Sequence, residues 1–280
     1  MSNLPLQIDS RVPLNDGFSM PLFGLGVYMS KEGNECQQAV STAIEAGYRL
    51  IDTAAFYDNE ESVGRAVRES QIPREELFVT TKLWNTDQGY DKALRAFDKS
   101  MDKLGLDYVD LYLIHYPLTG KRLDSWRALE QIVQSGRCRS IGVSNYLSRH
   151  LTELSEHSSI VPVVNQIEMS PYCFESRIDT VEYCRQHGII VQAYSPLVRT
   201  KVFDDPDLLE IANRYGKSPA QILIRWGLQE GISSIPKSSN PDRIRANADI
   251  FDFELSVEDM QKLRSFDRNL IVCWDPAEAV

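Results

Sequence analysis

The chain has 280 residues, of which 30 are basic and 40 acidic, and its formal net charge is −10 at pH 7. Hydrophobic residues make up 42% and charged residues 25%, proportions that exclude a disordered or fibrous chain. Nucleic acid is disfavoured as a partner, because a duplex-binding surface needs an excess of basic residues.

Short runs rich in β-branched residues alternate with longer helical patterns along the chain. The predicted strands are 23–27, 49–53, 78–82, 109–115, 139–143, 163–168, 189–194 and 232–236. The predicted helices are 35–46, 60–69, 90–104, 125–135, 148–156, 176–187, 206–215, 219–229, 241–247 and 257–266. Glycines such as Gly47, Gly105 and Gly136 follow these helical patterns directly, at the position where helices commonly end.

This alternation predicts one α/β domain over residues 1–280, a single (β/α)8 TIM barrel with right-handed crossovers. Residues 7–18, with the turn Asn15-Asp16-Gly17, predict an N-terminal β-hairpin, and a short C-terminal tail follows the last helix. A doubly wound dinucleotide fold is disfavoured, because Gly24 and Gly26 are not followed by a third glycine or by an immediate helix. We instead expect these two glycines to allow close packing.

The cysteines and the first residues indicate a cytoplasmic protein. The five cysteines are widely spread and include no C-x-x-C pair, so we expect reduced thiols. Residues 1–5 lack the basic and apolar segments of a signal peptide, and no apolar run is long enough to cross a bilayer. We expect no membrane partner, and we expect a monomer because no segment is typical of association.

Four side chains capable of proton chemistry follow neighbouring predicted strands. Asp52, Lys82 and His115 end three of these strands, and Tyr57 lies in the loop after Asp52. Catalytic groups of such barrels gather at the carboxyl ends of the strands, so the four residues are expected to meet. Lys82 would lower the pKa of Tyr57 and make it a better acid. Asp52 would hold Lys82, and His115 would orient a carbonyl oxygen.

Other chemistries are less well supported. Taken singly, each of these four residues also fits a structural role, and it is their joint placement that favours catalysis. No metal site is expected, because His150, His157 and His187 lie in helical patterns without a paired ligand spacing. Residues 142–146 imitate a nucleophile elbow but lack its closing glycine.

Several segments resemble the signatures of the aldo-keto reductase family. GYRLIDTA at 47–54, GVSNY at 142–146 and IPKSS at 235–239 resemble its three signatures, and TTKLW at 80–84 and LIHYP at 113–117 resemble further family segments. The resemblance covers residues 15–276. Within the family, the chain is most similar to microbial and protist members such as diketogluconate reductases and prostaglandin F synthases.

The resemblance implies a role for each matching position. Asp52, Tyr57, Lys82 and His115 would form the catalytic tetrad, with Tyr57 as general acid. The cofactor would be bound by Val27, Ser144, Asn145, Gln166, Tyr194, Ser195, Leu197, Lys237, Ser238, Arg243 and Asn247. The substrate pocket would be formed by Tyr28, Trp84, Tyr116 and Trp274.

The implied activity is the NADPH-dependent reduction of a small aldehyde or ketone, with weaker use of NADH. Tyr194 would stack on the nicotinamide, and Lys237 and Arg243 would bind the 2′-phosphate of NADPH (NADP+ when oxidised). A basic cluster of Arg199, Lys201, Lys237, Arg243 and Arg245 is consistent with this cofactor despite the acidic total. Two alternatives stay open. One is an accessory or structural protein that binds the cofactor and has incidental activity; the other is a barrel enzyme with Lys82 as a Schiff-base nucleophile.

Three positions depart from the family pattern. Tyr116 stands where Trp is common, Val198 where a glycine usually follows Ser-Pro-Leu, and Ala246 where an acidic residue often meets the adenine. These residues are expected to change a pocket wall, the loop over the pyrophosphate and the affinity for cofactor. The loop from Pro117 to Asp124 is short, which predicts an open substrate site.

Overall fold

Eight parallel strands form the central sheet of the protein, which is described by a computed structural model over residues 5–279. The strands are β3 Leu25–Gly26, β4 Leu50–Asp52, β5 Phe78–Leu83, β6 Val109–Ile114, β7 Cys138–Ser144, β8 Val164–Glu168, β9 Ile190–Tyr194 and β10 Ser233–Ser234. All eight predicted strands are confirmed, although the first and the last are shorter than expected. The ends of the predicted domain and most of the segment tested for a signal peptide, residues 1–4 and 280, lie outside the described residues.

The two edges of this sheet meet and close it into the predicted barrel. Parallel bridges join the segment around β3 to β10 and the residues after it. The Gly24 amide donates to the Ser234 oxygen at 3.0 Å, and the Gly26 amide donates to the Pro236 oxygen at 3.2 Å. A Cβ atom on Gly26 would lie 2.9 Å from the Ile235 oxygen across this seam, and a Cβ atom on Gly24 would lie 2.3 Å from the Leu50 side chain of β4. The expected packing role of these glycines is confirmed.

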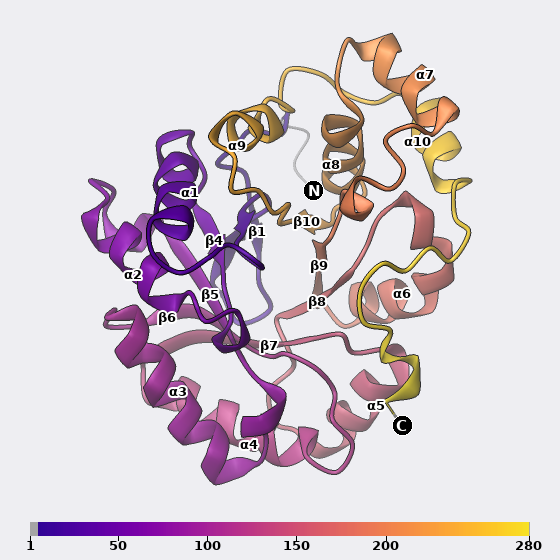
Figure 1. The fold of residues 1–280 in the computed structure, drawn as a ribbon. Helices are drawn as coiled ribbons and strands as arrows, with labels where there is room; N and C mark the ends of the chain where they lie inside the picture. The colour runs from indigo at the N-terminus through magenta and orange to yellow at the C-terminus, as the bar shows by residue number, and fades with distance from the viewer. Residues whose placement is uncertain (1–4, 280) are drawn as a thin grey trace.

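Ten α-helices surround the strands in the described part of the chain (Figure 1). They are α1 Asn34–Glu45, α2 Glu60–Glu69, α3 Tyr90–Leu104, α4 Arg122–Gln134, α5 Ser148–His157, α6 Ile178–Gln186, α7 Pro206–Tyr215, α8 Pro219–Gln229, α9 Pro241–Ala248 and α10 Val257–Arg264. Each predicted helix is present. The start of α6 is later than predicted because Glu175–Arg177 forms a separate 3-10 turn. Among the described helices, none is long and apolar enough to span a membrane.

The N-terminal hairpin lies further along the chain than residues 7–18. Strands β1 Arg11–Pro13 and β2 Ser19–Pro21 pair antiparallel, with Arg11 opposite Pro21. The predicted turn is correct, and Gly17 adopts φ +93° there and donates to the Leu14 oxygen. The predicted bounds were wrong because they ended one residue after the turn. A hairpin needs a second strand after the turn that is about as long as the strand before it.

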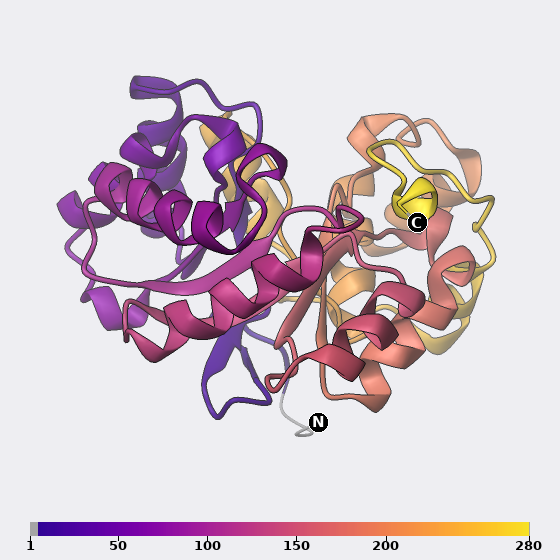
Figure 2. The same ribbon diagram turned by 90° about the horizontal axis from the view of Figure 1, so that it is seen from below.

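The hairpin closes the amino-terminal end of the barrel. Its residues Leu14 and Met20 are buried against Leu50, Phe78 and Leu111, which come from three barrel strands. Figure 2 shows the indigo hairpin below the barrel, on the side away from the yellow C-terminal tail. The interior is therefore apolar at this end and covered by the hairpin.

Candidate active site

Alternation along the parallel strands decides which polar side chains enter the barrel. Leu50 and Leu113 belong to the apolar cluster inside it. Asp52 and His115 lie two residues further along the same segments, so they point to the same side, one layer nearer the carboxyl ends. Lys82 lies four residues after Phe78 of the same cluster, and this even spacing also points its side chain into the barrel. The lining of the barrel thus changes from apolar to polar at this layer.

The four predicted catalytic residues meet here. Lys82 is fully buried, and its Nζ donates to Asp52 Oδ1 at 2.6 Å, to the Thr53 oxygen at 2.8 Å and to the Tyr57 hydroxyl oxygen at 3.3 Å. These three acceptors match the three hydrogens of an ammonium group, so we assign Lys82 its charged form. Because the oxygen of Tyr57 accepts from Lys82, its own hydrogen is free to be donated to a ligand.

Burial dominates the pKa shifts of this group. It raises the pKa of Asp52 and lowers that of Lys82, and the 2.6 Å contact between the two opposes both shifts. Burial also raises the pKa of Tyr57 well above its usual range, and the charge of Asp52 adds to the rise. The expectation of a lowered pKa for Tyr57 does not hold on balance, because the cost of desolvating the phenolate is the largest influence on this group. The phenol therefore stays protonated at neutral pH.

His115 supplies a second polar group beside this phenol. Its ring is edge-on to the Tyr57 ring, with centroids 5.6 Å apart. Burial, and after it the positive charge of Lys82, lowers the pKa of His115 well below its usual value. Its Nδ1 is buried and has no hydrogen-bond partner among the described residues. A neutral imidazole carries one N–H, which can be donated to an oxygen held beside Tyr57.

A cavity of about 510 Å³ opens over these groups and brings most of the predicted residues together. The predicted residues that line it are Tyr28, Asp52, Tyr57, His115, Ser144, Asn145, Gln166, Tyr194, Ser195, Leu197, Lys237 and Trp274. Lys82 is not part of the lining and lies behind Tyr57. A carbonyl carbon could not reach its nitrogen from the cavity, which disfavours the Schiff-base alternative.

Hydrogen bonds connect the residues predicted to hold the nicotinamide. The Tyr194 hydroxyl donates to Asn145 Oδ1 at 2.7 Å, and Asn145 Nδ2 donates to the His115 oxygen at 2.9 Å. Gln166 Nε2 donates to Asp52 Oδ2 at 2.7 Å and to a second glutamine, Gln192. Both amide hydrogens of Gln166 are therefore used, and only its carbonyl oxygen is left for a ligand.

The residues predicted for the adenosine end lie around the start of α9. Asn240 caps this helix by accepting from the Arg243 amide at 3.0 Å, and the side chains of Lys237 and Arg243 are exposed beside it. A helix N-terminus with two cations suits a phosphate group. Ser238 and Asn247 are buried in the same segment, outside the lining of the cavity.

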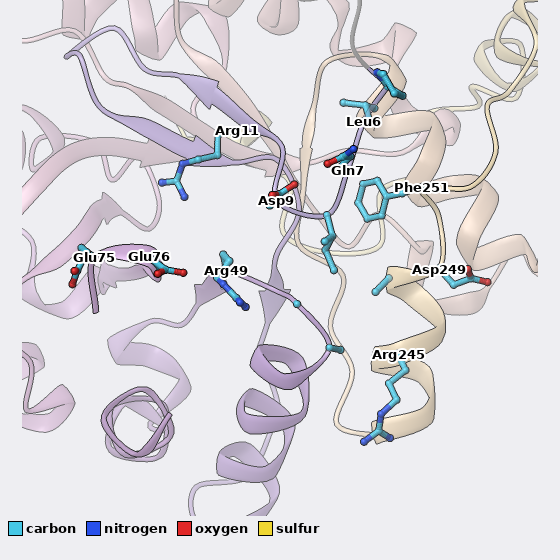
Figure 3. Close-up of a pocket in the computed structure, with 15 residues that line it drawn as sticks. Leu6, Gln7, Asp9, Arg11, Arg49, Glu75, Glu76, Arg245, Asp249 and Phe251 are labelled. Carbon is cyan, nitrogen blue, oxygen red and sulfur yellow. The ribbon is translucent and has the colours of Figure 1, made fainter. Parts of the chain in front are cut away.

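Arg245 does not share this region, contrary to the prediction that it belongs to the basic cluster. It lines a separate cavity of about 1120 Å³ at the amino-terminal end, with Arg11 and Arg49 (Figure 3). Residues two apart on a helix point about 200° away from each other, so Arg243 and Arg245 cannot face the same ligand. Glu75 and three further acidic residues also line this cavity, and no excess of positive charge results.

Trp274 lines one wall of the active-site cavity, and two further aromatic rings pack against it. Phe56 and Trp84 stack with centroids 3.8 Å apart, and Trp274 lies 5.7 Å from Phe56 and 5.9 Å from His115. Neither Phe56 nor Trp84 lines the cavity itself. Phe56, which was not predicted, directly precedes Tyr57 and is partly exposed, and this position was a usable signal in the sequence.

Three further predicted or missed residues complete the site. Tyr116 does not line the cavity, and its hydroxyl donates instead to the Asp275 oxygen at 3.2 Å. Val27 is buried below the cavity, where its amide donates to the Asp52 oxygen at 3.1 Å. Cys273, which was not predicted, lines the cavity, and its Sγ atom lies 3.2 Å from Ser195 Oγ.

In the loop after β9, Val198 holds a backbone conformation that glycine adopts more readily. Val198, Arg199 and Thr200 adopt φ values of +49°, +48° and +63°. A β-branched residue is rare in this left-handed region because its Cβ approaches the backbone too closely. The loop that borders the cavity at Arg199 and Thr200 is therefore strained in this chain.

Comparisons with known proteins agree with this geometry. The model of the aldo/keto reductase family matches residues 23–268. The glyoxal reductase of Bacillus subtilis is 48% identical to this chain over 275 residues, which cover 98% of this chain and 99% of the relative. A 9,11-endoperoxide prostaglandin H2 reductase of Trypanosoma cruzi is 47% identical over 268 residues, which cover 95% of this chain and 94% of the relative.

A solved structure has the same fold. A Bombyx mori aldo-keto reductase in complex with NADP superposes with a TM-score of 0.87 at 42% sequence identity. The match covers 95% of this chain and 95% of that one. The similarity therefore extends over nearly the whole barrel.

Proposed function

Because the chain belongs to the aldo/keto reductase family, we propose that it reduces aldehydes or ketones to alcohols with NADPH, using Tyr57 as the general acid. The observation that carries the proposal is the buried chain of contacts from Asp52 through Lys82 to the Tyr57 hydroxyl, which ends at the cavity. Weaker use of NADH is part of the proposal.

The proton chemistry follows from the charged Lys82. When bound, the reduced nicotinamide supplies the hydride that adds to the carbonyl carbon. Tyr57 donates its proton to the oxygen as negative charge develops there, and an alkoxide is a stronger base than a phenolate, so the transfer is downhill. The ammonium of Lys82, 3.3 Å from the phenolic oxygen, stabilises the phenolate that forms, and Asp52 keeps that ammonium in place. His115 donates its N–H to the same substrate oxygen.

The residues around the cavity fit the proposed cofactor. Tyr194 presents a ring whose orientation is held by its hydrogen bond to Asn145. Ser144, Asn145 and Gln166 line the same part of the cavity and offer polar atoms to a carboxamide. Arg199 and Lys237 add two cations toward the phosphates. Each of these contacts would hold the nicotinamide beside Tyr57 and His115.

We extend the proposal to a cytoplasmic monomer. All five cysteines are free thiols, and four of them are buried. Sedimentation of the purified protein at several concentrations tests the monomer directly, and a mass twice that of the chain would contradict it.

The test is the consumption of NADPH by the purified protein with aromatic aldehydes, small dicarbonyls, keto-sugars and ketones. We expect loss of the reduced-nicotinamide absorbance and one alcohol formed for each NADPH oxidised. Tight binding of NADPH with no turnover on any of these carbonyls would contradict reduction as the function. That outcome would favour the alternative of a cofactor-binding accessory protein.

A further inference from the structure

The C-terminal tail, residues 270–279, supplies one wall of the active-site cavity. It follows α10, passes α6 and ends beside α5 (Figure 1). Trp274 of this tail lines the cavity, and its ring lies 5.6 Å from Trp84 and 5.9 Å from His115. The closure of this wall therefore depends on how firmly the tail is held.

Two side chains of α5 hold the end of the tail. Arg149 Nη2 donates to three main-chain oxygens, at 3.2 Å to Pro276, at 2.7 Å to Ala277 and at 3.2 Å to Ala279. The Nε2 atom of the neighbouring His150, whose side chain is buried, lies 2.6 Å from the same Ala279 oxygen. These contacts gather the carbonyl groups of the tail on one helix.

The tautomer of His150 follows from its second contact. The Leu147 amide donates to His150 Nδ1 at 3.1 Å, so Nδ1 accepts and Nε2 carries the hydrogen donated to Ala279. The ring thus links the first turn of α5 to the end of the tail. Both donors of this latch, Arg149 and His150, use side chains that the catalytic machinery does not.

Other contacts hold the tail immediately before and immediately after Trp274. Glu168 accepts from the Val272 amide at 2.7 Å and from the Cys273 amide at 2.9 Å. Asp275 pairs with Arg177 at 2.8 Å. The tail itself has only one short 3-10 turn, Pro276–Glu278, which has too few internal hydrogen bonds to be stable alone. The position of Trp274 is therefore set by contacts outside the tail.

We propose that Arg149 and His150 are positioning residues that fix Trp274 and so make the enzyme selective for flat aromatic carbonyl compounds. This inference rests on the proposed reductase function. Trp274 then presents its ring to the cavity, with Phe56 and Trp84 packed against it from behind. An aromatic ring of the substrate packs on Trp274 while its carbonyl oxygen meets Tyr57 and His115. A small aldehyde does not reach this wall and gains nothing from the latch.

The test compares 2-naphthaldehyde with acetaldehyde in the Arg149→Ala variant. Arg149 is exposed, so its removal should leave the barrel folded. We expect the KM for 2-naphthaldehyde to rise about threefold to tenfold, the loss of one aromatic contact. The kcat for both aldehydes, the KM for acetaldehyde and the Kd for NADPH should be unchanged. Arg149→Lys should restore part of the lost affinity.

A double variant shows whether Arg149 acts through Trp274. Trp274→Ala should raise the KM for 2-naphthaldehyde by itself, and Arg149→Ala in that background should add nothing further. Additive effects would overturn the proposal, as would an unchanged KM in Arg149→Ala. Arg127→Ala, which removes an exposed arginine that pairs with Asp124 on α4, is the matched control and should behave as the unaltered protein.

Hydrogen exchange separates failure of this inference from failure of the proposed function. Arg149→Ala should speed amide exchange in residues 270–279 and leave the barrel strands unchanged, whether or not any aldehyde is reduced. Unchanged exchange in the tail would show that the latch does not hold it. No turnover in the unaltered protein, together with faster exchange in the variant, would contradict the reductase function and leave the latch supported.

Discussion

At the scale of single residues, the shifted pKa values of Tyr57 and His115 determine how reduction depends on pH. The pKa of Tyr57 is raised by burial, and that of His115 is lowered by burial and by Lys82. The acid form of Tyr57 is the active one in reduction, so activity is lost only as pH rises through its raised pKa. His115 stays neutral through the neutral range.

We therefore expect kcat/KM for reduction to be level from about pH 6 to about pH 9 and to fall only beyond it. Oxidation of the alcohol needs the phenolate of Tyr57, so its rate should rise with pH over the alkaline range. Both directions can be measured on one preparation. A fall in reduction centred between about pH 6 and 7 would instead implicate an ionising histidine.

Val198 gives a second test at this scale, because its φ of +49° favours glycine. Val198→Gly and Val198→Ala both remove the buried side chain, but only glycine relieves the strain. We expect the glycine variant to be more stable than the alanine variant by about 1 kcal/mol in the free energy of unfolding by denaturant. At Val143, a buried residue inside strand β7, the order should be the opposite. If the glycine variant were the more stable at both positions, backbone strain at Val198 would not explain the difference.

At the scale of secondary-structure elements, the contact between α2 and α3 depends on one glycine. A Cβ atom on Gly64 of α2 would lie 1.8 Å from the Leu104 oxygen at the end of α3. Gly64→Ala should therefore lower the free energy of unfolding by about 1 to 3 kcal/mol, through forced displacement of the helices. Thermal or denaturant unfolding measures this.

Gly227 is the matched control, because it also lies inside a helix, α8, and a Cβ there would meet nothing within 4 Å. Gly227→Ala should leave stability unchanged or raise it by up to about 1 kcal/mol, the difference in helix propensity. Equal losses at Gly64 and Gly227 would show that the close approach of α2 and α3 does not determine the effect.

The elements of the barrel were predictable because each follows from a local pattern. Apolar runs such as that of β6 mark strands covered on both faces, and glycines mark the ends of several helices. The shortness of β3 and β10 was not predictable, since it results from how the two edges of the sheet meet. The bounds of the hairpin were missed because the residues that pair across the turn carry no clear pattern in the sequence.

The site was predictable to the extent that strand ends define it. Asp52, Lys82 and His115 could be placed together from strand parity and from the family resemblance. The direction of the pKa shift of Tyr57 could not, because it depends on the complete burial of the phenol. The contact of Arg149 with the tail that carries Trp274 could not be predicted either. It joins residues more than a hundred positions apart, and it depends on the path that the tail takes in the folded chain.

At the scale of the whole molecule, a net charge of −10 must coexist with an anionic cofactor. We propose that Lys237 and Arg243, exposed near the start of α9, supply the positive charge that the cofactor needs. Removing both, as Lys237→Ala with Arg243→Ala, should raise the KM for NADPH about tenfold or more and change the KM for NADH much less, because only NADPH carries the 2′-phosphate. Initial rates with each cofactor give both values.

Arg245→Ala is the control for this experiment, since Arg245 lines the cavity at the other end of the barrel. It should change neither KM. Equal rises in the KM for NADPH and NADH in the double variant would contradict recognition of the 2′-phosphate by Lys237 and Arg243.

The central claim, that Tyr57 donates the proton, is tested most directly by turnover of the Tyr57→Phe variant with NADPH and an aromatic aldehyde. Phenylalanine keeps the ring between Tyr28 and His115 and removes only the hydroxyl that Lys82 contacts. We expect kcat to fall by about 10² to 10⁴ while the Kd for NADPH stays within about twofold. Turnover equal to that of the unaltered protein would contradict it.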